Sequence, residues 1–285
     1  MNNQGNPISY FQTKLSSKDF EKLSRFIMSE YGIKMPPENK IMLQSRLQKR
    51  LKALNISTFN EYVDYVFSPL GQSEEVIHMM DVVSTNKTDF FREPVHFDFL
   101  LTDALPEIIN IKNIRNLKVW SAGCSSGEEP YTLAIVLSEF KEHNPGIDFS
   151  IDATDISTRM LTVAANAVYQ EAKTADLPMT IKHKYFLRSK NRDEKKVRVK
   201  SELRSKVKFY RKNLLYVPYC NNPEFDIIFC RNVLIYFDRN NQYSILQKLC
   251  MHIKSGGYLF LGHSESITGF ELPLQHIKPT IFQKL

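Results

Sequence analysis

The sequence has few cysteines, and they lack the arrangements that give cysteine a structural or metal-binding role. Its four cysteines are spread over 285 residues, and none of them form a Cys-x-x-Cys pair. A disulfide framework and a zinc knuckle are therefore not indicated. The seven histidines are also scattered, without the spacing of metal ligands, so we predict no metal site.

Long apolar runs and a leader segment are missing as well. No run approaches the roughly 20 apolar residues needed to cross a bilayer, and the first residues show no basic stretch followed by an apolar one. Membrane insertion is therefore not expected, and the simplest expected location is the cytoplasm. Hydrophobic residues make up 42% and charged residues 24% of the chain, ordinary proportions for a protein with a buried core.

The net charge of +7 is distributed unevenly along the chain. Residues 182–212 carry a net charge of +11 and residues 40–52 a net charge of +5, which leaves −9 for the rest. Such asymmetry is typical of proteins with an acidic partner, whether a nucleic acid, an anionic surface or an acidic protein. The alternative is that each basic region is only a solvated face.

Residues 16–80 have the pattern of a small helical bundle, preceded by a loose tail over residues 1–15. Apolar residues recur at helical spacing in four segments, a capping pattern begins the first at Ser16, and Gly32 ends it. The second predicted helix passes through the basic region of residues 40–52. We therefore predict an N-terminal helical domain over residues 16–90.

From residue 117 onward, short apolar strands alternate with helices. Strands are predicted at 117–121, 149–155, 207–210, 225–230 and 256–262, with helices at about 129–142, 158–166 and 240–252. This alternation predicts an α/β fold with a parallel sheet covered on both faces. Apolar and basic residues alternate with period 2 over 197–200 and 206–210, which predicts a small antiparallel β-subdomain inserted at about residues 185–212.

The strongest local signal is a strand that ends in small residues and leads into a helix, over residues 119–129 (VWSAGCSSGEE). Glycines let the backbone approach a ligand, and a helix N-terminus offers free N–H groups. A triphosphate-binding loop would continue with Gly-Lys-Ser/Thr, whereas Gly127 is followed by Glu128 and Glu129. Two carboxylates suit a nucleoside-type cofactor with cationic groups and hydroxyls, and Asp155 ends the next strand, where such sheets place an acid for ribose. The alternative is an ordinary tight turn.

Five segments carry a more specific pattern. They are residues 84–93 (STNKTDFFRE), 120–131 (WSAGCSSGEEPY), 153–156 (ATDI), 228–238 (IFCRNVLIYFD) and 261–265 (LGHSE). Together they resemble the chemotaxis receptor glutamate O-methyltransferases of the CheR type. The resemblance covers residues 16–285 and implies a Rossmann-like, doubly wound S-adenosylmethionine-dependent methyltransferase domain at residues 91–285. It also implies methyl transfer to glutamate side chains on the cytoplasmic helices of chemoreceptors, with S-adenosylhomocysteine as product.

The resemblance implies roles for individual residues. Arg92 and Tyr236 match residues placed near the transferred methyl group. The residues that match cofactor-binding positions are Asn86, Thr88, Arg92, Glu128, Glu129, Asp155, Asn213, Leu214, Asn232 and Val233. Which of Glu128 and Glu129 contacts the cofactor stays open. The alternatives are an ion pair with a nearby acid such as Glu93 for Arg92, and a place in the core for Tyr236.

The chemistry implied for these residues is simple. A glutamate side chain is already a carboxylate at neutral pH, so its methylation needs no general base. The remaining task is positioning, in which Arg92 can orient the substrate carboxylate. On the basic helix, Arg46, Lys49 and Arg50 lie at i, i+3 and i+4 and share a face. We predict that this face binds the acidic receptor helices, where such charges speed encounter and set register.

Two other functions compete with this interpretation. A nucleic-acid methyltransferase would explain the charge of residues 182–212, but the DPPY/NPPY and Pro-Cys sequences of such enzymes are missing. A non-catalytic adaptor is the other, and the intact Arg92, Asp155, Asn232 and Tyr236 argue against it. The loop at residues 189–196 has no glycine, unlike the loop of members that dock a receptor's C-terminal tail, so tail docking stays open. We expect a monomer.

Overall fold

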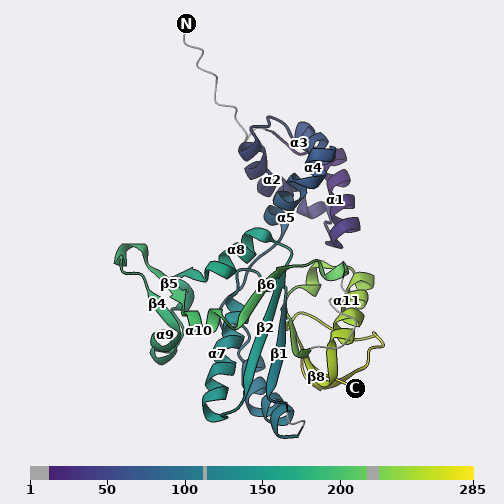
Figure 1. Ribbon diagram of the computed structural model, residues 1–285. Helices are drawn as coiled ribbons and strands as arrows, with labels where there is room; N and C mark the ends of the chain where they lie inside the picture. The colour runs from purple at the N-terminus through teal and green to yellow at the C-terminus, as the bar shows by residue number, and fades with distance from the viewer. Residues whose placement is uncertain (1–12, 112–113, 217–224) are drawn as a thin grey trace. The chain divides into compact units, whose positions relative to one another are not determined.

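The computed structural model describes residues 13–111, 114–216 and 225–285, and the chain forms two compact units, Met1–Thr85 and Asn86–Leu285 (Figure 1). The first unit is built from helices, and the second contains both sheets. The boundary between the units falls at residue 85, whereas the sequence analysis ends the helical domain at residue 90. Among the residues described, no helix has both the length and the apolar character needed to span a bilayer.

The first unit is a bundle whose first helix begins and ends at the signals found in the sequence. The Ser16 hydroxyl caps it by accepting a hydrogen bond from the Asp19 N–H at 3.0 Å, and Gly32 ends it in the left-handed region at φ 66°. The elements are α1 (Ser17–Tyr31), η1 (Pro37–Asn39), α2 (Lys40–Leu54), α3 (Phe59–Val66), α4 (Pro69–Ser73) and α5 (Glu75–Val83). Their apolar faces meet in one buried core, which stabilises the unit.

The second unit is organised around a seven-stranded sheet in the order β6-β2-β1-β7-β8-β10-β9. The strands are β1 (Asn116–Ala122), β2 (Asp148–Asp155), β6 (Val207–Arg211), β7 (Phe225–Cys230), β8 (Ile253–Leu261), β9 (Leu274–Lys278) and β10 (Ile281–Lys284). The first five strands in the sheet order pair in parallel, and β10 and β9 add an antiparallel edge. Helices α7 (Glu128–His143), α8 (Thr158–Asn166) and α11 (Arg239–His252) pack on these strands (Figure 1). The predicted fold class, a Rossmann-like α/β sheet with a separate helical bundle, is confirmed.

A small antiparallel sheet in the order β3-β5-β4 extends from the second unit (Figure 1). Its elements are β3 (Val168–Gln170), η4 (Glu171–Thr174), α9 (Met179–Tyr185), β4 (Phe186–Arg188), η5 (Arg192–Glu194), β5 (Lys196–Val199) and α10 (Ser201–Arg204). Its strands lie within residues 168–199, whereas the sequence predicts the insertion at about residues 185–212. Of the two sheets that the sequence pattern allows for residues 207–210, β6 joins the main one, in parallel with β2. An edge strand has one face on the core and one in solvent, so its period-2 pattern matches that of an antiparallel strand.

Several segments form elements that the sequence pattern does not predict. Residues 95–111 form α6 (Val95–Phe99) followed by two π-helical turns, η2 (Leu100–Ala104) and η3 (Glu107–Ile111). The others are α4, the β3–α9 segment of residues 168–185, and the short C-terminal strands β9 and β10. The segment from Val95 packs Phe97, Phe99 and Leu100 into the core of the second unit, so the chain before it reaches the sheet in a defined position.

Candidate active site at the carboxyl ends of β1, β2 and β7

The order of the parallel strands defines where a ligand can bind. Strand β1 lies between β2 and β7, and the chain moves outward from β1 in both directions, so β1 and β7 flank a topological switch point. In open α/β sheets, ligands bind in the crevice outside the carboxyl ends of the strands at such a point. The turn at Gly123–Gly127 follows β1, Asp155 ends β2, and Arg231–Val233 follow β7. Of the predicted site residues, Asp155, Asn232 and Val233 lie on these connections, and Glu128 and Glu129 begin the helix that follows the first of them.

The turn after β1 requires glycine at two positions. Gly123 has φ 84°, in the left-handed region, and a Cβ atom there would lie 2.3 Å from the Val233 side chain. Gly127 has φ 94°, and a Cβ atom there would lie 2.8 Å from the Cβ atom of Ala164. The Thr154 carbonyl accepts a hydrogen bond from the Gly123 N–H at 2.7 Å, which fixes the turn against β2. Any side chain would therefore displace the turn from its neighbours.

Asp155 holds the same turn from the end of β2. Its Oδ2 accepts a hydrogen bond from the Ser125 N–H at 2.8 Å, and its Oδ1 accepts one from the Ser157 N–H at 2.8 Å. The Ser125 hydroxyl donates to the Asn86 carbonyl at 3.0 Å. The structure thus brings together Asn86, Asp155 and the glycine turn.

Three further predicted residues lie near these contacts. The Lys212 N–H donates to the Asp155 carbonyl at 3.0 Å, which places Asn213 and the buried Leu214, the first residue of η6 (Leu214–Tyr216), beside that corner. The Thr88 carbonyl accepts a hydrogen bond from the Lys173 ammonium. These residues therefore line the same edge of the sheet.

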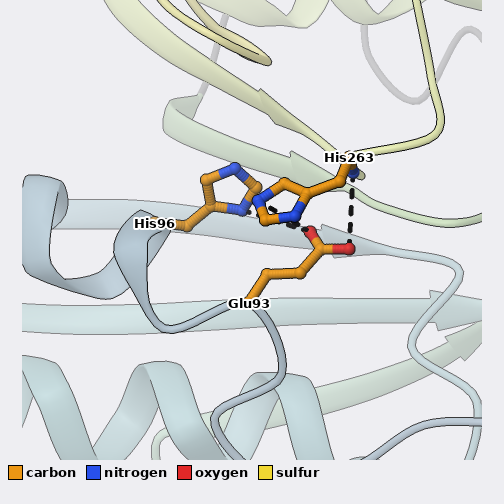
Figure 2. Close-up of side chains that lie close together, drawn as sticks. All are labelled: Glu93, His96 and His263. Carbon is orange, nitrogen blue, oxygen red and sulfur yellow. Dashed lines mark hydrogen bonds and ion pairs between the residues drawn. The ribbon is translucent and has the colours of Figure 1, made fainter.

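The Glu93 carboxylate faces two neighbouring histidine rings, His96 and His263, that come from different parts of the chain (Figure 2). Its Oε2 lies 3.5 Å from Nδ1 of His96 and 4.0 Å from Nε2 of His263, and its Oε1 accepts a hydrogen bond from the His263 N–H at 3.3 Å. His96 is fully buried, and burial together with the nearby charge of Arg231 lowers its pKa to about 4. The ring of His96 is therefore neutral at pH 7.

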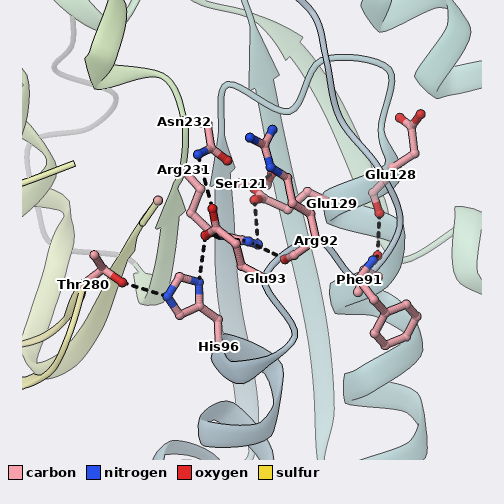
Figure 3. Close-up of polar contacts among 12 residues, drawn as sticks. Phe91, Arg92, Glu93, His96, Ser121, Glu128, Glu129, Arg231, Asn232 and Thr280 are labelled. Atoms are coloured by element: carbon pink, nitrogen blue, oxygen red, sulfur yellow. Dashed lines mark hydrogen bonds and ion pairs between the residues drawn. The ribbon is translucent and has the colours of Figure 1, made fainter. Parts of the chain in front are cut away.

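Arg231 joins Glu93 to Glu129 in a buried group that we call the Arg231 network (Figure 3). Its guanidinium lies 3.0 Å from Glu93 and 3.4 Å from Glu129, and it also donates to the Arg92 carbonyl. Burial alone would raise the pKa of Glu93, but the charge and hydrogen bonds of Arg231 lower it. Glu93 is therefore held as a carboxylate beside the backbone of Arg92.

The two adjacent acids of the helix start, Glu128 and Glu129, have different surroundings. Glu129 accepts a hydrogen bond from the Ser121 hydroxyl at 2.7 Å and faces Arg231, whereas Glu128 accepts one from Ser126 at 2.6 Å and faces Lys173 at 3.4 Å. Burial raises the pKa of both acids, and Arg231 opposes this rise for Glu129. Figure 3 shows Glu129 directed toward Arg92 and Arg231, with Glu128 on the opposite side of the helix start.

The Arg92 side chain is separate from the Arg231 network's ion pairs. Its guanidinium donates to the Lys87 carbonyl at 3.0 Å, and Glu93 pairs with Arg231 instead. The alternative in which Arg92 serves as the ion-pair partner of Glu93 is therefore not what the contacts show. Arg92 is close enough to Glu129 for its charge to favour the ionised form of that acid.

Glu265 shapes the loop after β7. Its two oxygens accept four backbone hydrogen bonds, from Asn232, Val233, Leu234 and Gly262, at 3.0, 2.8, 2.7 and 2.6 Å. Asn232 takes a left-handed backbone at φ 58°, and η7 (Leu234–Tyr236) follows and carries the half-buried Tyr236. A Cβ atom on Gly262 would lie 2.5 Å from the Asn232 side chain, so the residue facing this loop must be glycine.

Arg231 and Glu265 are not among the predicted site residues, although both lie inside motifs that carry the family resemblance, at residues 228–238 and 261–265. Their partners are distant in the chain, since Arg231 and Glu93 are 138 positions apart and Glu265 and Asn232 are 33 apart. The signal that could have found them is a charged side chain in an otherwise apolar or glycine-bearing strand end. A buried charge needs a partner, so each one predicts an unseen contact.

The predicted basic face of α2 is largely engaged within its own unit. Arg50 pairs with Glu75 through two hydrogen bonds of 2.8 Å, and Arg46 donates to the Val83 carbonyl. Lys49 is the exposed member of the three. The shared face is thus present, but two of its three charges hold α2 to the segment that begins with α5.

The donor and acceptor set at the strand ends fits an S-adenosylmethionine cofactor. Glu129 offers a carboxylate for an ammonium group, Asp155 one for ribose hydroxyls, and the glycine turn offers backbone without side chains. A cationic cofactor is favoured over an anionic one by the two acids at the start of α7, of which Glu128 is buried and Glu129 half-buried. The residues present therefore fit the group.

Comparison with known proteins identifies both units. The model for the CheR methyltransferase all-alpha domain matches residues 18–84, and the model for the CheR methyltransferase SAM binding domain matches residues 86–282. A chemotaxis protein methyltransferase of Borreliella burgdorferi is 37% identical over 276 residues, 95% of each chain. One of Escherichia coli is 35% identical over 257 residues, 90% of this chain and 87% of that one.

Proposed function

The chain belongs to the CheR methyltransferase family and binds S-adenosylmethionine, and we propose that it methylates glutamate side chains on the cytoplasmic helices of chemoreceptors. The coarser activity, that of an S-adenosylmethionine-dependent chemotaxis protein methyltransferase, follows from the family. The observation that supports methylation of glutamate is the position of Arg92. Arg231 donates to its carbonyl and pairs with Glu93, so the Arg92 guanidinium is not engaged in that ion pair. A cytoplasmic location is part of this proposal.

We assign the cofactor to the strand-end connections described above. Glu129 would hold its amino-acid end and Asp155 its ribose, with Asn213 and Leu214 beside the adenine and Asn86, Thr88, Asn232 and Val233 lining the remainder. Glu128 is the weaker candidate, because its carboxylate faces Lys173 and Ser126. When bound, the cofactor supplies an electrophilic methyl group on a sulfonium.

The protein's own contribution is positioning rather than proton transfer. A substrate glutamate is ionised at pH 7, so no base must accept a proton. Arg92 can donate two parallel hydrogen bonds to the substrate carboxylate and orient it. Tyr236, on the loop that Glu265 holds, can donate a hydrogen bond or exclude water, and excluding water favours the joining of an anion and a cation.

Receptor binding is assigned to the first unit with a revised emphasis. Of Arg46, Lys49 and Arg50, the exposed Lys49 is the best placed to meet an acidic helix. Arg46 and Arg50 support it by holding α2 in place. Exposed charges of this kind affect the rate of encounter more than the affinity.

The proposal is tested with labelled S-adenosylmethionine and purified chemoreceptor cytoplasmic fragments. We expect a product that releases methanol in mild alkali, because carboxyl methyl esters hydrolyse whereas N-methyl groups do not. Arg92→Gln should lower kcat/KM by roughly 10- to 100-fold, the value of a lost charge-assisted contact. Arg115→Gln, at an exposed arginine beside β1, is the matched control and should retain activity.

Two outcomes would contradict the proposal. An alkali-stable product on nucleic acid would favour the rival nucleic-acid methyltransferase. Cofactor binding without methylation of any receptor fragment would favour the adaptor function.

A further inference from the structure

Glu93, His96 and His263 form a group of ligand atoms that no step of the proposed reaction uses. One oxygen of Glu93 and one ring nitrogen of each histidine all lie within 4.8 Å of one another. Figure 2 shows the three side chains converging from the segment before α6, from α6 itself and from the loop after β8. All three belong to the second unit, so their arrangement is set within one compact body.

The Thr280 hydroxyl lies against one of the two ring nitrogens of His96. Its oxygen is 2.9 Å from Nε2 of His96 and 2.7 Å from the Pro279 carbonyl, and its one proton can go to either. When it goes to the carbonyl, Nε2 donates to the Thr280 oxygen and Nδ1 presents a lone pair.

Among the described residues, His96 Nδ1 has no hydrogen-bond partner. This atom is buried and lies 3.5 Å from Glu93 Oε2. In the tautomer with a lone pair on Nδ1, two acceptors face each other, which is unfavourable in a buried site. A cation placed between them would satisfy both.

We propose that Glu93, His96 and His263 form a binding site for a Zn²⁺-type transition metal ion. Two imidazole nitrogens and one carboxylate oxygen are a ligand set that zinc uses in sites with an open position. Zinc bonds of about 2.0–2.1 Å at tetrahedral angles separate neighbouring ligand atoms by roughly 3.4 Å. The observed separations of 3.5 and 4.0 Å from Glu93 Oε2 need only a small contraction.

A metal site also needs neighbouring groups that hold its ligands in the right orientation. The non-ligating nitrogen of a metal-bound histidine usually donates a hydrogen bond, and the Thr280 oxygen lies 2.9 Å from Nε2 of His96, where it could accept one. The His263 ring is 54% exposed, so an ion can enter from solvent.

Arg231 shares Glu93 Oε2 with the proposed site, at 3.0 Å. A carboxylate oxygen has two lone pairs, so it can accept the guanidinium and ligate an ion at once. The guanidinium charge nevertheless opposes a second cation. We therefore expect reversible binding that is weaker than in a dedicated structural zinc site, and an occupied site would link the Arg92 segment to the loop after β8.

The experiment uses the full chain stripped of metal with a chelator and needs neither cofactor nor receptor. Zn²⁺ is titrated by calorimetry, and Co²⁺ by its visible absorption, which reports ligand number and geometry. We expect one ion per chain, with His263→Ala weakening binding by at least about tenfold, since even second-shell changes cost that much. His143→Ala, at an exposed histidine at the end of α7, is the matched control and should bind as the original protein does.

Three results would overturn the site. They are an absence of saturable binding, equal affinities of the His263→Ala and His143→Ala proteins, and a Co²⁺ spectrum that stays that of the aqueous ion. Because no methyl transfer is measured, failure here would leave the proposed function untouched, and the reverse also holds.

Discussion

Two buried arginine–glutamate groups, one in each unit, have the same components but different construction. In the helical unit, Arg50 meets Glu75 through two bonds of 2.8 Å, and the Tyr62 hydroxyl donates to the same carboxylate at 2.8 Å. In the second unit, Arg231 is shared between two acids at 3.0 and 3.4 Å and a backbone carbonyl. The first group is saturated and compact, whereas the second is spread over several strand ends.

This difference distinguishes an ion pair that stabilises the fold from a charged group that can bind a ligand. Glu75 has each oxygen paired with Arg50, and its other neighbour is Tyr62, whose pKa is raised by burial and by that carboxylate. Glu129 is less completely buried, its contact with Arg231 is longer, and burial raises its pKa. A buried acid that is only partly compensated gains most from a cationic ligand. We therefore expect substitutions in the first group to affect folding and those in the second to affect binding.

The largest effect is expected for Glu75→Ala. It leaves Arg50 and Tyr62 without their acceptor, and breaking a buried pair from one side costs about 3–5 kcal/mol. The measurement is the free energy of unfolding of the helical unit by urea denaturation. Glu74→Ala, at the exposed neighbouring glutamate, is the control and should cost little. A similar loss in both proteins would remove the distinction between the two groups.

Glu265→Gln should have the next largest effect, and it should lower both the folding stability and the affinity for the cofactor product. The amide replaces an acceptor by a donor that faces backbone N–H groups, so two of the four bonds are lost. We expect about 2–4 kcal/mol less stability and weaker S-adenosylhomocysteine binding, because Asn232 and Val233 lose their support. Calorimetric titration and urea denaturation measure the two effects, with the exposed Glu271→Gln as control. Unchanged binding would show that the loop does not contact the cofactor.

Glu129→Gln should weaken S-adenosylhomocysteine binding by roughly 10- to 100-fold, the value of a charge-assisted hydrogen bond. Its folding stability should stay equal or rise, because a partly compensated buried charge is removed. Glu128→Gln is the matched variant and should bind S-adenosylhomocysteine more tightly than Glu129→Gln does. Equal affinities, or a large loss of stability in Glu129→Gln, would place Glu129 with Glu75 as a structural acid.

The smallest effect is expected for Asp148→Asn, at a surface aspartate that belongs to neither arginine–glutamate group. Asp148 lies 2.6 Å from Lys206 and 3.0 Å from Lys141, and these hydrogen bonds, chiefly that from Lys206, lower its pKa to about 2. Its side chain is half exposed, so Asp148→Asn should cost less than about 1 kcal/mol.

The pH dependence gives the sign of that effect. A lowered pKa means that the carboxylate stabilises the fold above about pH 4 and that this contribution disappears as the pH falls toward 2. Urea denaturation at pH 7 and near pH 2 should therefore show a difference between the two proteins only at pH 7. A difference that persists at low pH would mean that the substitution acts through packing instead.

Local pattern predicted the elements that have strong signals of their own. The capped helix at Ser16–Gly32, the strand of residues 225–230 and the helix of residues 158–166 agree closely with the structure. Residues 95–111 carry no such signal, and the pattern of residues 206–210 fits both the main sheet, where β6 lies, and the small inserted one. Strand partners are chosen by contacts far along the chain, and a short amphipathic run carries no record of them.

For the site, the sequence alone determined which chemistry is available: a glycine turn, acids at strand ends, and the motifs that identify the family. Only the tertiary structure decided the ion pairs. Glu129 faces Arg231 and Glu128 faces Lys173. Glu93 pairs with Arg231 instead of with Arg92, and Arg50 pairs with Glu75 within its own unit. The physical reason is that a buried charge is stabilised by whichever opposite charge folding brings within a few ångströms, and that partner is on average many residues away.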